Sequence, residues 1–291
     1  MKNRLNNDIA EINDALRRFT AHSENPQHQI YEAMEYSLYA GGKRLRPVLM
    51  LETAKMFGAD TKAVMPFACA MEMIHTYSLI HDDLPAMDND DLRRGMPTNH
   101  KKFGEAIAIL AGDALLNKAF ETVTSVTELP PERVLKAASM LAASSGTEGM
   151  IGGQVVDIES EGHKIDLPQL KYLHLLKTGA IIRSSCTIGA VLGGAAEHEV
   201  RAVDEFASNL GVAFQIRDDI LDCTGTVEEL GKPIGSDEAE DKNTYVSLLG
   251  LEKSRELVEE YSAKAKAALG IFKERADFLL RLTDYLVSRS S

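Results

Sequence analysis

Apolar residues recur at spacings of three and four along almost the whole chain, and this helical periodicity is what most limits the folds open to it. The stripe from Val64 through Phe67 to Ile74 is one example, and no sustained two-residue alternation predicts strands. The Gly, Pro and Ser breaks between periodic segments are too short to be linkers. We therefore predict one all-α domain over residues 1–291, with helices at 3–20, 27–39, 44–57, 61–83, 104–126, 131–149, 168–176, 178–193, 199–222, 251–268 and 272–289.

The charge and the cysteines narrow the function classes. A net charge of −12 argues against a nucleic-acid partner, because phosphate backbones need a basic face. Cys69, Cys186 and Cys223 are odd in number and lack metal-ligand spacing, so neither a zinc site nor a disulfide framework is expected. The amino terminus has no apolar core of signal-peptide length, and no later segment approaches the ~18 apolar residues of a membrane span. We expect a soluble, cytoplasmic protein without a membrane span.

An acidic run follows the apolar helix that begins near residue 61. Asp82 and Asp83 are expected in its last turn, because Pro85 biases the chain out of α geometry. That is the negative end of the helix dipole, where neighbouring carboxylates also repel each other, so a cation is expected there. Arg93 and Arg94 follow at once and suit a dianion held beside a metal. A solvated acidic loop is the simpler alternative.

A second acidic run ends another long helical pattern. Its polar stripe is spaced by four, three and four residues, at Gly211, Gln215, Asp218 and Asp222. Gln215 adds a dipole below the carboxylates, and Gly211 is expected to leave open space below that. If the two acidic helices run parallel, their carboxylates meet across a cavity at one end of a bundle. Hard oxygen ligands with waters to spare favour Mg²⁺, which usually completes its shell with substrate phosphates.

Basic residues are concentrated in short motifs. The turn Gly41-Gly42 is followed by three cations in four residues, and Lys43 and Arg46 among them could converge on one anion. A solvated helix cap is the alternative for this turn. His75 lies two helical turns before Asp82 and on the same stripe, although a lone histidine can equally be structural.

Two helix breaks and a long loop complete the candidate features. The glycine pair at 152–153 interrupts a helical pattern, which indicates close helix packing or a kink. Lys177 stands at another helix break and can reach into a cavity. The loop from Thr224 to Asn243 is longer than a plain connector inside one domain needs, so we expect a functional flap.

The ordered set of motifs resembles the trans-isoprenyl diphosphate synthases. The set comprises Gly-Gly-Lys-Arg-Leu-Arg-Pro, Asp-Asp-x4-Asp, Arg93-Arg94, Lys177-Thr178, and Phe-Gln before Asp-Asp-x2-Asp, within residues 36–250. The insertion Pro85-Ala86 in the first Asp motif is similar to that of bacterial farnesyl diphosphate synthases, or geranyltranstransferases, and of plant geranylgeranyl synthases. The resemblance implies the isoprenoid synthase class I fold, in which about ten or more helices surround a central cavity.

The same resemblance implies a transferase of isoprene biosynthesis. Such an enzyme condenses isopentenyl diphosphate with dimethylallyl and geranyl diphosphate to give farnesyl diphosphate. It is expected to be a homodimer and to use three Mg²⁺ ions, with Mn²⁺ as a substitute, that bridge the allylic diphosphate to both Asp motifs.

The resemblance also implies roles for individual residues. Its metal ligands are Asp82, Asp88 and Asp218, and its catalytic set is Asp82, Asp83, Asp88, Arg93, Lys177, Asp218, Asp219 and Asp222. The allylic diphosphate site comprises Arg93, Lys177, Thr178, Gln215, Lys232 and Lys242, and the isopentenyl diphosphate site comprises Lys43, Arg46, His75 and Arg94. Tyr77 and Ser78 are expected to set chain length, with the Tyr77 ring closing the cavity below a farnesyl chain. A tyrosine that only packs against a neighbouring helix is the alternative.

Other functions stay open from the sequence. A geranylgeranyl diphosphate synthase would share these motifs, whereas a non-catalytic partner subunit of a prenyl synthase commonly lacks one of the two Asp motifs. A class I terpene cyclase shares the acidic helix end but needs no second diphosphate pocket, against which Lys43, Arg46 and Arg94 argue. A helical protein that only binds a divalent cation is the least specific alternative.

Overall fold

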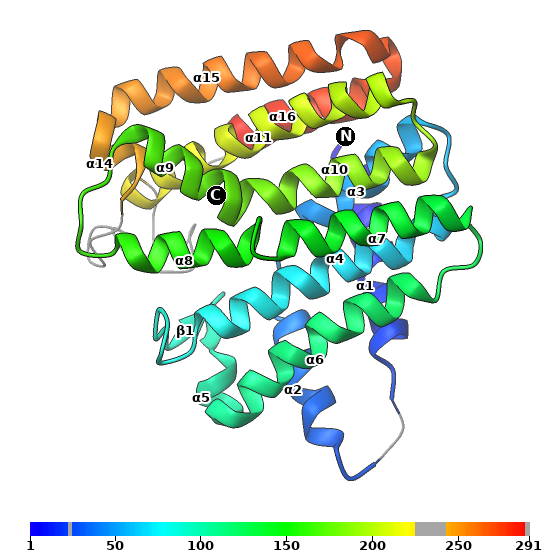
Figure 1. Cartoon of the computed structure of the whole chain (residues 1–291), viewed down its shortest axis with the longest axis vertical. Helices are drawn as coiled ribbons and strands as arrows, with labels where there is room; N and C mark the ends of the chain where they lie inside the picture. The colour runs from blue at the N-terminus through cyan, green and yellow to red at the C-terminus, as the bar shows by residue number, and fades with distance from the viewer. Residues whose placement is uncertain (23–24, 225–242, 289–291) are drawn as a thin grey trace.

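Helices lie side by side through the bundle (Figure 1). The computed structural model describes residues 1–22, 25–224 and 243–288, and within them the only sheet is a short antiparallel hairpin. The elements are α1 (Lys2–Thr20), α2 (His28–Leu38), α3 (Leu45–Met56), α4 (Thr61–Asp82), β1 (Leu92–Arg93), β2 (Met96–Pro97), α5 (Asn99–Phe103), α6 (Glu105–Thr124), α7 (Pro131–Ser145), α8 (Met150–Ser160), α9 (Leu167–His174), η1 (Leu175–Gly179), α10 (Ala180–Gly193), α11 (Glu197–Thr224), α14 (Tyr245–Leu249), α15 (Leu251–Ala268), η2 (Leu269–Ala276) and α16 (Asp277–Ser288). The all-α prediction is confirmed.

α4 is the central helix and contacts α1, α2, α3, α6 and α10. Its predicted apolar stripe is fully buried, from Val64 to Ile74. The Asp60 side chain accepts a hydrogen bond from the backbone N–H of Lys62 and so caps the helix start. The helix ends at Asp82, ahead of Pro85 as predicted. The first acidic run therefore begins where the core helix stops.

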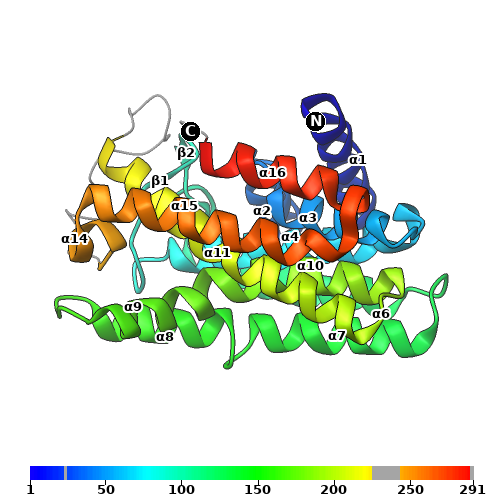
Figure 2. The same ribbon diagram turned by 90° about the horizontal axis from the view of Figure 1, so that it is seen from above.

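α4 and α11 run in the same direction, and their carboxyl-terminal ends lie at the same side of the molecule (Figure 1). α10 contacts both of them and also packs against α3. The view from above shows α7 and α8 end to end along one face of the bundle, with α16 toward the opposite face (Figure 2). The parallel arrangement required for the two Asp motifs to meet is present.

Among the residues that the structure describes, two stretches are long and apolar enough to cross a membrane, namely α4 and Leu167–Gly193. The expectation that no segment approaches such a span was wrong in this respect. Their apolar windows are 72% and 67% buried inside the protein, which is the burial expected of core helices.

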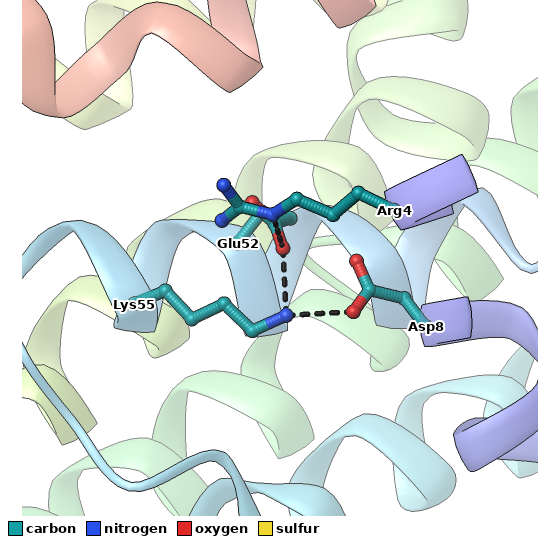
Figure 3. A network of polar contacts seen from close by, with 4 residues as sticks. All are labelled: Arg4, Asp8, Glu52 and Lys55. Atoms are coloured by element: carbon teal, nitrogen blue, oxygen red, sulfur yellow. Dashed lines mark hydrogen bonds and ion pairs between the residues drawn. The ribbon is translucent and has the colours of Figure 1, made fainter. Parts of the chain in front are cut away.

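An ionic network ties α1 to α3 (Figure 3). Arg4 donates to both carboxylate oxygens of Glu52, whose side chain is fully buried. The Lys55 Nζ lies 2.6 Å from Asp8 Oδ1 and 2.8 Å from Glu52 Oε1. Burial raises the pKa of Glu52, and its hydrogen bond with Lys55 opposes that rise. The amino-terminal helix is thereby fixed to the bundle by charge as well as by apolar packing.

The segment expected to interrupt a helix at residues 152–153 is itself helical. α8 runs through both glycines, and a Cβ placed on Gly153 would lie 2.3 Å from the backbone nitrogen of Lys177. Close packing, one of the two alternatives, is therefore what this glycine permits. The hairpin and α5 were not predicted either, because elements of two to five residues are too short to show periodicity.

Candidate active site

A cavity of about 580 Å³ lies between α4, α6, α8, η1 and α10 at the acidic end of the bundle. Its polar lining includes Arg46, His75, Asp82, Lys177 and Thr178, and its apolar lining includes Tyr77, Met87, Leu116, Met150 and Ile181. A largely apolar space with a carboxylate and a lysine in its wall can hold a hydrocarbon chain with an anionic head.

The loop after α4 folds Asp88 back onto Asp82. The backbone N–H of Asp88 donates to the carbonyl oxygen of Asp82 at 2.9 Å. Burial is the main cause that raises the pKa of the Asp82 carboxyl to about 6; Lys177 opposes the rise and Asp88 adds to it. Ionisation of the buried Asp82 carboxyl is therefore costly in the metal-free protein, as expected where a cation binds.

Asp83 and Arg93 form an ion pair in the wall of a separate small cavity of about 30 Å³. The Nε of Arg93 donates to Asp83 Oδ1 at 2.6 Å, and its Nη2 lies 3.1 Å from Asp90 Oδ2. Burial raises the pKa of Asp83, and its hydrogen bond with Arg93 lowers it. The structure thus places Asp83 as a buried support of Arg93, beside the large cavity and outside its lining.

A chain of hydrogen bonds links η1 to α11 and α14. Thr178 Oγ1 donates to Gln215 Oε1 at 2.9 Å, and Gln215 Nε2 donates to Asp219 Oδ1 at 2.9 Å. The other oxygen of the buried Asp219 accepts from the backbone N–H of Tyr245 at 2.8 Å. Asp219 therefore orients Gln215 and fixes the start of α14, while Gln215 orients the Thr178 hydroxyl.

Gln215, Asp218 and Asp222 follow one another on the α11 stripe at spacings of three and four residues. Burial lowers the pKa of the Arg46 guanidinium, and the charge of Asp218 raises it, so the second acidic motif acts on the first turn of α3. The space expected at Gly211 is absent, because a Cβ there would lie 3.4 Å from the Cα of Gly179. That part of the prediction was wrong, since Gly179 and Ile182 lie at van der Waals distance from such a Cβ.

A π-helical turn, η1, presents Lys177 and Thr178 to the cavity. Such a turn holds one more residue than an α turn and is frequent at functional sites. The Nζ of Lys177 lies 2.5 Å from Asp157 Oδ2 on α8, and Gly153, one turn earlier on α8, packs against the Lys177 backbone. The lysine is held in the cavity wall through both its side chain and its backbone.

A second cavity of about 450 Å³ adjoins the first and shares Arg46 and His75 with it. Its other cationic lining residues are Lys43, Arg44 and Arg94. The Nε of Arg46 is buried and has no hydrogen-bond partner among the described residues. Burial lowers the pKa of His75 well below its usual value, and Arg46 lowers it further. This cavity has the positive charge and the spare donor that an anion would use.

The glycine turn and the hairpin close one side of this cationic cavity. Gly41 and Gly42 have φ of 101° and 121°, conformations that glycine adopts without strain. Arg94, itself left-handed with φ 55°, donates to the carbonyl oxygen of Gly41. A Cβ on Gly42 would lie 2.8 Å from the Arg94 guanidinium. The glycine pair thus makes room for a cation from another element.

Tyr77 and Ser78 both line the 580 Å³ cavity. The Tyr77 ring is 5% exposed and packs edge-on against His81, with ring centroids 5.8 Å apart. Burial raises the pKa of Tyr77 to about 12, and Asp82 adds to the rise. Ser78 Oγ donates to the carbonyl oxygen of His75 at 2.9 Å, so its hydroxyl bonds to its own helix. The Tyr77 ring is the larger obstacle to a chain extending down the cavity.

Within residues 1–22, 25–224 and 243–288, no three His, Cys, Asp or Glu side chains gather closely enough to hold a metal ion by themselves. The donors that are present near the cavity end, Asp82 and Asp88, are carboxylates. Mg²⁺ is commonly bound through one or two carboxylates, several waters and substrate phosphates, so this donor set fits it. A tetrahedral zinc site, which takes nitrogen and sulfur ligands, does not fit.

Comparison with known proteins identifies the family. The family described as Polyprenyl synthetase matches residues 27–276. The chain belongs to this family. It is 52% identical over 254 residues to the farnesyl diphosphate synthase of Geobacillus stearothermophilus, a match that covers 87% of this chain and 85% of that one.

Two further relatives of this polyprenyl synthetase bear on its product and fold. The large subunit 1 of a heterodimeric chloroplast geranylgeranyl pyrophosphate synthase from Arabidopsis thaliana is 50% identical over 270 residues, covering 90% of this chain and 73% of that one. The crystal structure of an apo FPP/GFPP synthase from Zymomonas mobilis matches with a TM-score of 0.89 at 37% identity, covering 99% and 98% of the two chains. The fold is therefore that of prenyl synthases.

Gln154 and Asp157 of this polyprenyl synthetase were not predicted as residues of the site from the sequence. Gln154 lines the large cavity, and its amide nitrogen and oxygen are buried without a partner among the described residues. Asp157, three residues later, holds Lys177. Their spacing of one helical turn was a visible signal, but the glycine pair before them hid the helix. Lys232, Lys242 and most of the predicted flap lie outside the described residues.

Proposed function

We propose that this polyprenyl synthetase is a prenyltransferase that condenses isopentenyl diphosphate with dimethylallyl and then geranyl diphosphate to give farnesyl diphosphate. The observation that carries the proposal is the pair of adjoining cavities. One is lined by Lys43, Arg46 and Arg94, and the other joins an acidic end to a long apolar body. Two substrates that share a diphosphate but differ in their hydrocarbon chains fit these two sites. A terpene cyclase has no use for the cationic cavity.

The acidic end binds the allylic substrate. Three Mg²⁺ ions, which Mn²⁺ can replace, would be held by Asp82, Asp88 and Asp218, with Asp222 close by. When bound, the metal would neutralise charge on the diphosphate leaving group as the allylic C–O bond breaks. The raised pKa of Asp82, caused mainly by burial and in part by Asp88, supports this assignment, since a divalent cation would remove the cost of ionising this carboxylate.

Cationic side chains stabilise the same leaving group. Lys177 points into the cavity from η1, Arg93 is presented by Asp83, and we assign Lys232 and Lys242 to the same clamp. These charges stabilise the diphosphate most once the bond has broken, which lowers the barrier rather than only tightening binding. The dipoles of Thr178, which lines the apolar cavity, and of Gln215, which is hydrogen-bonded to it, stabilise the allylic cation.

The cationic cavity holds isopentenyl diphosphate through Lys43, Arg46, His75 and Arg94. The double bond of this substrate attacks the allylic carbon, so that a C–C bond forms while the electron pair of the broken C–O bond stays on the diphosphate. Loss of a proton from the condensed product then restores a double bond. The released diphosphate accepts that proton, because none of the described cavity residues is placed as a better base.

Product length follows from the wall below the growing chain. The buried Tyr77 ring narrows the cavity beneath the acidic end, which supports farnesyl diphosphate as the main product. The farnesyl diphosphate synthase from Geobacillus stearothermophilus, at 52% identity, agrees with this product. Geranylgeranyl diphosphate is the second candidate, favoured by the 50% identity to the Arabidopsis thaliana subunit.

We further propose that the chain is a single domain that acts as a cytoplasmic homodimer. The exposed apolar side chains Ile109 and Leu110 support a partner at this face of α6. The buried thiols of Cys69 and Cys186 support a reducing compartment.

Product analysis tests the proposed function. The purified chain is incubated with Mg²⁺, isopentenyl diphosphate and each allylic starter in turn, and the products are separated by chain length. Farnesyl diphosphate from dimethylallyl and geranyl diphosphate is the expected result. Products longer than farnesyl would favour the geranylgeranyl alternative, and no turnover by the chain alone would favour the partner subunit.

A further inference from the structure

Arg44 stands in the middle of the cationic run but differs from its neighbours in what it contacts. Its side chain is 3% exposed, and each of its three guanidinium nitrogens donates to a different helix. Nε donates to Asn13 Oδ1 on α1 at 2.9 Å, and Nη1 donates to Glu72 Oε1 on α4 at 2.7 Å. Nη2 donates to the carbonyl oxygen of Leu38 on α2 at 2.6 Å. Arg44 therefore joins three helices at the floor of the cationic cavity.

The backbone of Arg44 is held in a conformation that an arginine seldom adopts. Its φ is 47° and its ψ is 33°, in the left-handed region, and it forms the N-cap of α3. Its carbonyl oxygen accepts from the backbone N–H of Val48 at 3.0 Å and so starts the helix. A strained residue persists only where its surroundings fix it. Here the three side-chain bonds fix it, and Lys43 on one side and Arg46 on the other take their directions from it.

The partner of Arg44 is also a member of the cavity wall. Glu72 is 2% exposed and lines the cationic cavity with Arg46 and Arg94. Burial lowers the pKa of both of those arginines, and the charge of Glu72 opposes this in each case. An unpaired carboxylate at this place would repel a diphosphate or draw Arg46 away from it. The guanidinium of Arg44 neutralises Glu72 inside the wall.

We propose that Arg44 is the positioning residue of the isopentenyl diphosphate site: its bonds to Asn13, Glu72 and Leu38 hold the left-handed turn from which Lys43 and Arg46 reach the diphosphate. This inference rests on the proposed function. We do not assign Arg44 to the diphosphate itself, because each of its guanidinium nitrogens already donates to protein and its side chain is buried. Its effect on the reaction passes through the neighbouring cations.

The test compares three variants of the purified chain. Arg44→Lys keeps a charge beside Glu72 but cannot reach three helices with a planar fork, and Arg44→Met loses both. Arg4→Met is the matched control, because it removes an arginine–glutamate pair between α1 and α3 whose Glu52 keeps Lys55 as a partner (Figure 3). KM for each substrate, kcat and the thermal midpoint are measured for all of them.

We expect Arg44→Lys to raise KM for isopentenyl diphosphate by about 3- to 10-fold and Arg44→Met by more, while KM for geranyl diphosphate stays within about 2-fold. Arg4→Met is expected to lower the thermal midpoint without changing either KM. An unchanged KM for isopentenyl diphosphate in Arg44→Lys would overturn the inference. So would an equal rise for both substrates that follows the loss of stability.

A binding measurement keeps this inference separate from the proposed function. The thermal midpoint of each variant is recorded with and without isopentenyl diphosphate, which needs no turnover. If the unaltered chain makes no product but is stabilised by isopentenyl diphosphate, and Arg44→Lys is stabilised less, the proposed reaction fails while the role of Arg44 stands. Equal stabilisation of both would overturn the role of Arg44 whatever the reaction is.

Discussion

Replacing Asp82 by asparagine should stabilise the metal-free protein while it abolishes catalysis. The pKa of Asp82 is about 6 in the folded protein against 3.8 ordinarily, a rise of about 2 units that corresponds to at most about 3 kcal/mol. Because the unfolded carboxyl ionises near 3.8 and the folded one near 6, the folded state binds more protons between these values. Stability therefore falls as pH rises through that window and stays lower above it. Asparagine has nearly the same shape as aspartate and carries no charge, so it avoids the free-energy cost of ionising a buried carboxyl.

The size of the effect is measurable by thermal unfolding. For a chain of 291 residues the unfolding entropy is about 0.6 kcal/mol/K, so ~3 kcal/mol corresponds to at most about 5 °C. After chelator treatment, Asp82→Asn should unfold at the same temperature as the unaltered chain near pH 4. As the pH rises toward 7, its unfolding temperature should exceed that of the unaltered chain by an increasing amount. The matched control Asp14→Asn removes an exposed carboxylate of α1 and should show no such trend. Turnover with Mg²⁺ should fall by at least about 100- to 1000-fold, because one ligand of a metal that stabilises the leaving group is lost. Equal or lower stability at pH 7, or a difference that does not grow with pH, would refute the reasoning.

Three further outcomes are expected. Arg46→Ala should raise KM for isopentenyl diphosphate about 10-fold or more, with less effect on the allylic substrate, since one charge-assisted contact to one diphosphate is lost; equal rises in steady-state assays would mean that the two sites are misassigned. Tyr77→Ala should shift the product to geranylgeranyl or longer diphosphates, because removal of a buried ring opens apolar volume; chromatography that still shows only farnesyl product from an active variant would exclude Tyr77 as the floor. Isopentenyl diphosphate should raise the pKa of His75 from its lowered value, because the bound anion offsets the field of Arg46; an imidazole NMR titration that is unchanged by the ligand would contradict this.

The sequence was informative where one physical rule acted alone. The buried stripe of α4 follows from the periodicity of its apolar residues, and its end before Pro85 follows from backbone sterics. The sequence also predicts that the acidic ends of α4 and α11 meet if the two helices run parallel, and the two helices do run parallel. α8 was missed because glycine has a low helix propensity. Its Gly153 is tolerated for a tertiary reason, the close approach of the η1 backbone, which no local pattern reveals.

Side-chain pairings were the other limit of sequence reasoning. Asp83 and Asp82 are neighbours in the same motif, yet Asp83 bonds to Arg93 and Asp82 lines the large cavity. The cavity that each carboxylate lines depends on where α4 ends and on the hairpin, which brings Arg93 beside Asp83. Likewise, Arg44 is only one more cation of a basic turn in the sequence, but its side chain is buried and bonded to three helices. Such partners are set by packing between distant segments.

The π turn decides which residues face the cavity, while the helices on either side of it keep their directions. It holds one residue more than an α turn, within Leu175–Gly179. Deletion of that residue would leave an ordinary α turn, so α10 would keep its close approach to α3, where a Cβ on Gly189 would lie 2.3 Å from the carbonyl oxygen of Met50. Only the residues of the turn itself would change position, and Lys177 and Thr178 among them line the large cavity. A one-residue deletion in this turn should therefore leave the fold intact while it alters the cavity wall.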